Sequence, residues 1–292
     1  MTEPRLAHVQ CLDGKGLHRM AYWEWGDPAN PRVLVCVHGL SRQGRDFDTL
    51  AQDLAPDYRV VCPDVVGRGR SDWLLDPAGY AIPAYVADMV TLIARLNVAQ
   101  VDWVGTSMGG LIGLVLASLP NNPVRRLVLN DVGPVIQPEA LRRIGAYLGQ
   151  PQHWKTLDEA AEALWAISQG FGPHTREQWL ALTRPQLVAH DQDGVAGFKS
   201  HYDPAIAAPV RAITTEMAAA GEALLWFSYD RITAPTLLLR GADSDLLSPA
   251  TALAMARRGP RAQLHELPGV GHAPTLVAAD QRAVVRNFLL AT

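Results

Sequence analysis

One serine in the chain is flanked by glycines at the spacing of an activated nucleophile. Residues 101–110 read Val-Asp-Trp-Val-Gly-Thr-Ser-Met-Gly-Gly, so Gly105 and Gly109 lie two positions either side of Ser107. Such glycines let a strand turn sharply into a helix and expose the serine hydroxyl at the end of the strand. We predict that Ser107 is a nucleophile for acyl transfer; the alternative is a plain glycine-rich turn.

A serine nucleophile needs a base that removes its proton, and His272 has the most suitable setting. Residues 268–274 read Pro-Gly-Val-Gly-His-Ala-Pro, a glycine-rich loop between an expected strand and the last expected helix. We predict that His272 acts as general base and general acid. The alternative is a solvated loop histidine.

The negative charge that develops on an attacked carbonyl oxygen needs two N–H donors. We expect one from Met108, which directly follows Ser107, and the other from Leu40, in the turn formed by residues 38–41. Donors of this kind come from the residue after the nucleophile and from the loop after an earlier strand. His38 could itself be catalytic, but its place before a glycine favours a role in bracing this loop.

These residues lie at the ends of elements that alternate along the first third of the chain. Short apolar runs predict strands, and apolar residues at helical spacing predict helices between them. Strands that are buried on both faces and joined by helices form a parallel sheet. The expected strands are 18–25, 33–37, 59–62, 101–105 and 126–130, after a hairpin turn at 13–16, and the expected helices are 46–54, 82–96 and 108–118.

The pattern changes from residue 133 to about 231, where amphipathic helical stretches follow one another without a convincing strand. This segment is rich in Trp and Leu, which linkers are not, so we predict an inserted helical lid. The strand pattern then resumes, with strands 236–240 and 262–267 and helices 249–258 and 280–290. The expected organisation is a core in two parts, 1–133 and 232–292, with a lid at 134–231.

Four motifs occur in order along the chain: His38-Gly39, Asp64-x-x-Gly67-x-Gly69-x-Ser71, Gly105-x-Ser107-x-Gly109-Gly110 and Gly271-His272. Together they resemble the α/β-hydrolase superfamily, in particular its lidded esterases, lactonases and C–C hydrolases. The resemblance implies an α/β fold with an eight-stranded, mostly parallel sheet, an antiparallel first hairpin, helices on both faces and a helical lid after the sixth strand. It also implies an acyl-enzyme mechanism that needs no cofactor.

The acidic member of the triad departs from the commonest pattern of the superfamily. The usual acid lies three residues past a glycine at the end of the seventh strand, and Ser244 occupies that position between Asp243 and Asp245. A minority of the superfamily takes its acid from the end of the sixth strand, where this sequence has Asp131. We predict Asp131, with Asp245 as the main alternative and Asp243 as a third. Each could instead cap a nearby turn.

Composition excludes several classes of partner. The 292 residues carry 26 Lys and Arg against 29 Asp and Glu, a net charge of −3, which makes nucleic acid and anionic membranes poor partners. The longest apolar stretch, 108–119, is shorter than the roughly 20 residues of a membrane span, and we expect a soluble cytoplasmic protein. Cys11, Cys36 and Cys62 form no Cys-x-x-Cys pair and are expected as reduced core thiols. No His-Glu-x-x-His pattern occurs, so no metal is expected.

We therefore predict a serine hydrolase that cleaves a carboxylic ester of a small molecule through an acyl-enzyme on Ser107. The same residues would serve lactone, amide or C–C bond hydrolysis, and the fold also occurs in non-catalytic small-molecule receptors. The candidates for substrate binding are Arg42, Trp165 and Trp226. Arg42 could instead brace its loop by pairing with Asp46 or Asp64, and the two tryptophans could be core residues. The oligomeric state is left open.

Overall fold

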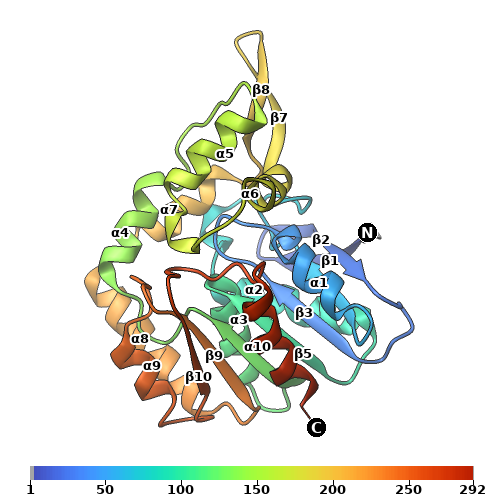
Figure 1. Ribbon diagram of the computed structural model, residues 1–292, viewed down its shortest axis with the longest axis vertical. Helices are drawn as coiled ribbons and strands as arrows, with labels where there is room; N and C mark the ends of the chain where they lie inside the picture. The colour runs from blue at the N-terminus through green and yellow to red at the C-terminus, as the bar shows by residue number, and fades with distance from the viewer. Residues whose placement is uncertain (1–2, 292) are drawn as a thin grey trace.

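The computed structural model describes residues 3–291, which are built around one sheet of eight strands (Figure 1). The strands are β1 (Arg5–Asp13), β2 (Gly16–Trp25), β3 (Val33–Val37), β4 (Arg59–Pro63), β5 (Val101–Thr106), β6 (Val124–Asn130), β9 (Thr236–Gly241) and β10 (Gln263–Leu267). Their order across the sheet is β1-β2-β4-β3-β5-β6-β9-β10. β2 is antiparallel to β1 and to β4, and all other neighbours are parallel. The predicted fold class is confirmed, including the antiparallel first hairpin.

Helices cover both faces of the sheet because its central strands are apolar on both sides. In β3, Val33, Val35 and Val37 pack into one core cluster, whereas Leu34 and Cys36 pack into the other. The first cluster includes residues of α2 (Ile82–Leu96), α3 (Met108–Ala117), α8 (Thr215–Asp230) and α9 (Pro249–Met255). The second includes residues of α1 (Asp48–Leu54) and α10 (Ala279–Leu290). All three cysteines are buried and unpaired.

The chain leaves the sheet after β6 and returns to it at β9, and most of the segment between forms a cap above the sheet (Figure 1). Its regular elements are the helices α4 (Pro138–Tyr147), α5 (Leu157–Ala166), α6 (Arg176–Thr183) and α7 (Ala207–Arg211), and the strands β7 (Leu187–Gln192) and β8 (Val195–Ser200). Short 3₁₀ turns are Gly44–Phe47, Pro77–Gly79, Gln169–Phe171, Arg184–Gln186 and Pro204–Ile206.

The expectation that this segment is wholly helical is wrong, because β7 and β8 form an antiparallel hairpin. The turn residues Asp193 and Gly194 both have positive φ, 55° and 81°. An Asp-Gly pair in this conformation is a strong hairpin signal. No residue of either strand is fully buried, so the strands lack the apolar alternation that predicts a half-buried strand.

The last helix of the inserted segment, α8, packs against α3 rather than with the cap. Figure 1 shows it beside α9, well away from α5, α6 and the β7–β8 hairpin. Its buried residue Tyr229 donates a hydrogen bond to the Met255 carbonyl of α9 at 2.7 Å. This helix therefore belongs to the layer that covers the sheet, although it precedes β9 in the chain.

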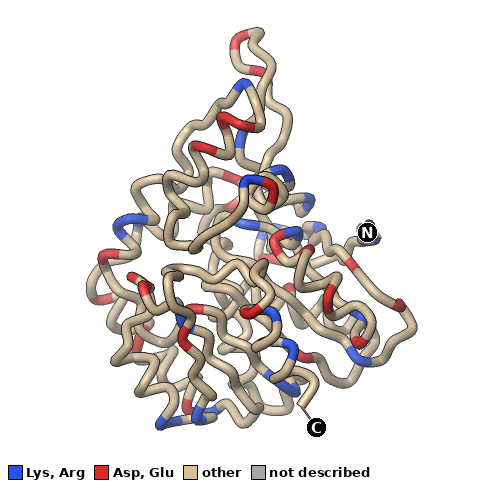
Figure 2. The backbone as a smooth tube through the Cα atoms, viewed as in Figure 1, with Lys and Arg blue, Asp and Glu red and all other residues tan. Residues whose placement is uncertain are grey.

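Charged residues of both signs are interspersed over the described chain (Figure 2). Over residues 3–291, many of these charged side chains form ion pairs, such as Arg286–Asp57 and Arg258–Asp230. Among the helices of these residues, none has the length and apolar character that crossing a bilayer requires.

Candidate active site

The turn between β5 and α3 leaves room only for glycine at two of its positions. Ser107 has φ 51° and ψ −117°, a conformation that residues with a side chain rarely adopt. A Cβ atom at Gly105 would collide with the Gly109 carbonyl, and one at Gly109 would collide with the Val37 carbonyl. The Ser107 N–H donates to the Asn130 carbonyl at 3.0 Å, which ties the turn to β6. The turn presents the Ser107 hydroxyl at the carboxyl end of the sheet.

Ser107, His272 and Asp131 form one chain of hydrogen bonds. The Ser107 hydroxyl lies 2.9 Å from His272 Nε2, and His272 Nδ1 lies 2.8 Å from Asp131 Oδ2. The histidine comes from the loop between β10 and α10, and the aspartate directly follows β6. The carboxylate is fully buried. In this geometry an imidazole can take the serine proton while the carboxylate fixes its tautomer and stabilises the imidazolium.

Three hydrogen bonds hold the Asp131 carboxylate. Gly241 N–H donates to Oδ1 at 2.9 Å, and the Ser244 hydroxyl donates to Oδ2 at 2.6 Å beside His272. These donors suit an ionised carboxylate, which only accepts hydrogen bonds. Ser244 was not among the site residues predicted from the sequence. The available signal was a hydroxyl in the position where the superfamily commonly has its acid.

The two alternative acids lie away from His272. Asp245 forms a two-pronged ion pair with Arg143 of α4, at 2.7 and 2.9 Å, and both side chains are nearly half exposed. Asp243 is exposed, and its backbone N–H donates to the Val270 carbonyl at 2.9 Å. The turn after β9 directs the Ser244 hydroxyl to the Asp131 carboxylate, and its two neighbours make other contacts. The structure brings Asp131 to the histidine and leaves Asp245 at the lid.

Two backbone amides next to the nucleophile have no hydrogen-bond acceptor within residues 3–291. They belong to Leu40, in the loop after β3, and Met108, the first residue of α3. The loop lies close to the nucleophile, since a Cβ atom at Gly39 would be 3.7 Å from Ser107 Cβ. Two free N–H groups at this place are what a developing oxyanion requires.

His38 braces the loop that carries Leu40. Its Nδ1 lies 2.7 Å from the Gly39 carbonyl, and its Nε2 accepts the Val65 N–H at 2.9 Å. The side chain is fully buried, and this burial lowers the pKa of His38 to about 3. The ring is therefore neutral at physiological pH and is fully engaged by backbone groups, in the bracing arrangement that the sequence favoured.

A cavity of about 110 Å³ lies over Ser107 and His272. The inserted segment contributes five of the apolar residues that line this cavity: Ile144, Leu164, Ile167, Phe171 and Leu182. The polar lining residues outside the hydrogen-bonded chain include Arg42, Arg143, Tyr147, Gln152, Gln186 and Tyr202. The lid also touches the histidine loop directly, because Gly271 N–H donates to the Gly170 carbonyl at 2.6 Å.

Arg42 both lines the cavity and braces its own loop. Its Nε and Nη2 donate to the two oxygens of Asp46, at 2.6 and 2.8 Å. Gln186 of the lid donates to the same carboxylate at 2.7 Å, and the Arg42 guanidinium lies 5.5 Å from the centre of the Phe171 ring. The bracing partner is therefore Asp46 and not Asp64. These contacts also connect the lid to the loop before α1.

Trp165 and Trp226, expected as substrate-binding side chains, are not among the residues that line this cavity. Trp165 packs edge-on against Trp179, with ring centres 5.0 Å apart, inside the lid's own apolar cluster. Trp226 lies on α8 against Tyr229, beneath the Arg258 guanidinium at 4.2 Å. Each tryptophan packs against neighbouring side chains, so both are packing residues and not part of the binding site.

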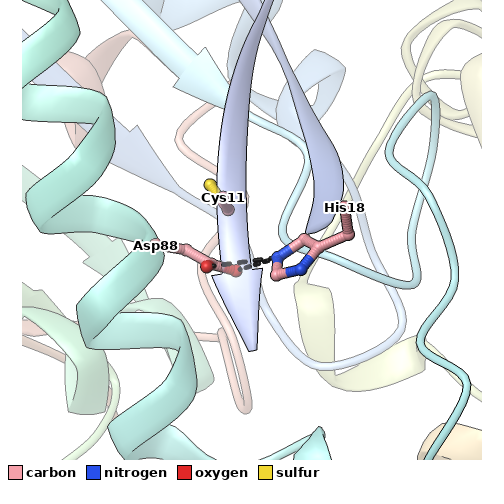
Figure 3. Close-up of side chains that lie close together, drawn as sticks. All are labelled: Cys11, His18 and Asp88. Atoms are coloured by element: carbon pink, nitrogen blue, oxygen red, sulfur yellow. Dashed lines mark hydrogen bonds and ion pairs between the residues drawn. The ribbon is translucent and has the colours of Figure 1, made fainter. Parts of the chain in front are cut away.

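One group of side chains elsewhere has the composition of a metal site. Cys11, His18 and Asp88 are buried where β1 and β2 meet α2, and their ligand atoms lie within 4.8 Å of one another (Figure 3). His18 Nε2 lies 3.2 and 3.1 Å from the two Asp88 oxygens. Burial and the neighbouring Asp88 raise the pKa of Cys11 to about 12, whereas metals bind the thiolate. These residues therefore form a buried group in which a protonated thiol lies beside a His–Asp hydrogen bond.

A family model described as the α/β hydrolase fold matches residues 32–279. The chain belongs to the α/β-hydrolase family. This α/β hydrolase is 58% identical over 288 residues to a 3-hydroxybutyrate-oligomer hydrolase of Cupriavidus necator, with 98% of each chain covered. It is 26% identical over 254 residues to esterase YbfF of Escherichia coli, covering 83% of this chain and 87% of the other.

The solved structures agree with this family. An α/β hydrolase of Novosphingobium aromaticivorans is 36% identical and matches with a TM-score of 0.84, covering 99% of both chains. Family membership and the highly identical relative together show that this α/β hydrolase is an enzyme that hydrolyses ester or related acyl bonds in a small molecule.

Proposed function

We propose that this α/β hydrolase cleaves oligomeric esters of 3-hydroxybutyrate, or of a similarly short hydroxy acid, through an acyl-enzyme on Ser107. The observation that carries the reaction is the hydrogen-bonded chain Ser107–His272–Asp131 at the base of a cavity. The substrate class is supported by the 58% identity to the Cupriavidus necator enzyme over nearly the full length of both chains.

The polar lining of the cavity also supports an oligoester. Each repeating unit of such a chain has an ester carbonyl that can accept a hydrogen bond and only a short apolar branch. Tyr147, Gln152 and Tyr202 offer hydrogen-bond donors to such carbonyls. A long aliphatic acyl chain would instead need a continuous apolar channel.

In the proposed reaction, His272 Nε2 takes the hydroxyl proton as Ser107 Oγ attacks the ester carbonyl. The Leu40 and Met108 N–H groups stabilise the resulting oxyanion, and Asp131 stabilises the imidazolium. His272 then gives the proton to the oxygen of the departing hydroxy acid, which leaves Ser107 acylated. Water attacks the acyl-enzyme, its proton passes through His272 to Ser107 Oγ, and the second acid is released.

The proposal is tested by incubating the protein with 3-hydroxybutyrate dimers and trimers and quantifying the released monomer, with p-nitrophenyl butyrate as a general ester. We expect turnover of both, loss of both in Ser107→Ala, and one organophosphonate adduct by intact mass in wild type and none in the variant. Cleavage of p-nitrophenyl butyrate without cleavage of either oligomer would reject the substrate class. Phosphonate labelling of Ser107→Ala at the wild-type rate would reject the nucleophile.

We also propose a cytoplasmic location. Three unpaired, buried cysteines support it, because free thiols persist in reducing compartments.

A further inference from the structure

Arg68 carries a buried charge that the proposed reaction has not used. It lies between the two glycines of the motif Asp64-x-x-Gly67-x-Gly69, and its side chain is completely buried. Buried arginines normally pair with a carboxylate, because taking an unpaired charge out of water is costly. Within residues 3–291, Arg68 forms no ion pair, and all its hydrogen-bond acceptors are neutral.

The neutral acceptors surround the guanidinium on several sides. Nε donates to the Leu40 carbonyl at 2.8 Å, and Nη1 donates to the Val66 carbonyl at 2.7 Å and to the Tyr85 hydroxyl at 3.0 Å. Nη2 has only the Met108 sulfur, a weak acceptor, at 3.6 Å. The rings of Tyr80 and Tyr85 lie 5.6 and 5.2 Å from the guanidinium carbon. One indirect link to a carboxylate runs through Tyr80, whose hydroxyl donates to Asp203 at 2.5 Å.

Two of these contacts reach the residues that we assign to the oxyanion hole. Arg68 holds Leu40 by its carbonyl, which fixes the backbone on one side of the Leu40 N–H. It also contacts the side chain of Met108, whose N–H is the second donor. One guanidinium therefore contacts both residues that carry the donors, and Arg68 itself does not line the substrate cavity.

A purely structural role would not require the charge. An apolar side chain of similar volume would fill the same space, and replacing buried ions with apolar residues is often neutral or stabilising. A positive charge without a carboxylate partner, however, favours negative charge that develops nearby, and does so strongly in a site shielded from water.

We propose that Arg68 is a positioning residue of the oxyanion hole: it fixes Leu40 and Met108, and its unpaired charge stabilises the anion formed on the substrate carbonyl oxygen. This inference rests on the proposed roles of Ser107, Leu40 and Met108.

The test compares Arg68→Met with wild type on p-nitrophenyl butyrate and measures the affinity for a trifluoromethyl ketone, which adds to an active-site serine and forms an oxyanion. We expect kcat/KM to fall about tenfold to hundredfold, mostly in kcat, and the affinity for the ketone to fall in parallel. A packing defect alone would lower the melting temperature without this parallel. Arg68→Lys keeps the charge without the planar fork and should recover part of both losses.

Arg59→Met is the matched control. Arg59 is the first residue of β4, at the amino end of the strand, whereas Ser107 follows the carboxyl end of β5. Arg59 pairs with Glu24 at 2.7 Å, so its loss removes a largely buried arginine remote from the nucleophile. We expect a lower melting temperature, with kcat/KM and ketone affinity within twofold of wild type.

A folded Arg68→Met protein with wild-type kcat/KM and ketone affinity would overturn the role of Arg68. If that variant does not fold, Arg68→Gln, which keeps hydrogen-bond donors without the charge, decides, and wild-type values for it would likewise overturn the proposal. Failure of the reaction scheme gives a different result: Ser107→Ala would keep its esterase activity, or the ketone would not inhibit wild type.

Discussion

The position after β9 that commonly holds an acid in this superfamily carries the hydroxyl of Ser244. This hydroxyl donates to Asp131 Oδ2 and accepts the Leu247 N–H at 3.1 Å, so it is fixed from both sides. A second carboxylate here would face Asp131 across a buried space, and like charges at that distance do not both remain ionised. An acid after β6 and a hydroxyl after β9 are thus compatible, whereas two acids would conflict.

This arrangement predicts different results for two aspartate variants. Asp131→Asn should lower kcat by about 10⁴-fold, the loss known for the equivalent change in a serine protease, because the amide favours the wrong histidine tautomer. Asp245→Asn removes an exposed ion pair with Arg143, and such pairs contribute about 0–1 kcal/mol to stability. Its kcat should stay within about threefold of wild type. Steady-state kinetics on one ester at a mildly alkaline pH measure both.

Circular dichroism should first show that both variants are folded to the same extent as wild type. If Asp131→Asn keeps nearly full activity and Asp245→Asn is inactive, the protein in solution uses Asp245, the acid after β9, in place of Asp131. Ser244→Ala adds a graded control, since it removes one donor to Asp131 and leaves the charge in place.

At the scale of elements, the lid has an apolar cluster whose members Leu164 and Leu182 reach the cavity, whereas Trp165 does not. Trp165, Trp179 and Leu182 belong to one cluster with Val277, which precedes α10. The exposed side chain of Ile167 instead reaches the cavity from the end of α5. Trp165, which does not line the cavity, and Ile167, which does, therefore allow lid stability and selection of the acyl group to be tested separately.

We expect Trp165→Ala to lower stability by about 1–3 kcal/mol, less than a fully buried tryptophan because Trp165 is only partly buried. Values of kcat/KM for p-nitrophenyl esters of increasing acyl length should fall in equal proportion, because Trp165 does not line the cavity. Thermal unfolding and kinetics across the ester series provide the two measurements.

Ile167→Ala is the matched variant on the pocket face. It should cost little stability, since Ile167 is 38% exposed, and should shift preference toward longer acyl groups. If Trp165→Ala changes the preference and Ile167→Ala does not, the cavity in solution has a different lining.

At the scale of the whole molecule, buried groups behind the active site make stability depend on pH. Burial lowers the pKa of His38 to about 3, so the unfolded chain binds more protons at this residue between about pH 3 and 6.5. This contribution to stability is complete above pH 6.5 and is lost as the pH falls toward 3. Burial raises the pKa of Asp64 to about 6, which has the opposite sign: stability falls as pH rises from about 4 to 6.

His38→Gln removes only the histidine contribution. The variant should be less stable than wild type at pH 7, because it loses the bonds to Gly39 and Val65. The difference should shrink by on the order of 2 kcal/mol by pH 4.5, since wild type alone must protonate His38 on unfolding. Denaturant unfolding at several pH values measures it, and a constant difference across this range would contradict the buried, neutral state of His38.

The fold class, the nucleophile turn and the candidate histidine could be predicted from the amino-acid sequence alone. These features are local: alternating apolar runs encode a parallel sheet, and glycines two residues either side of Ser107 encode the sharp turn that the collisions at Gly105 and Gly109 now explain. The hairpin turn at Asp193-Gly194 was equally local, but its exposed strands gave no apolar pattern.

The partners that these residues contact could not be predicted in the same way, because they depend on how the chain folds. Asp131 and Asp245 both follow strands that end at the same side of the sheet. The turn after β9 directs Ser244 to Asp131 and leaves Asp245 paired with Arg143. Trp165 and Trp226 lie in segments with a helical apolar pattern. Such a pattern does not show which face of a helix packs against a neighbour and which faces a cavity. Arg68 reads as one residue of a glycine turn, and its contacts with Leu40 and Met108, 28 and 40 residues away, exist only once the chain has folded. Contacts between distant segments depend on packing directions that no local pattern encodes.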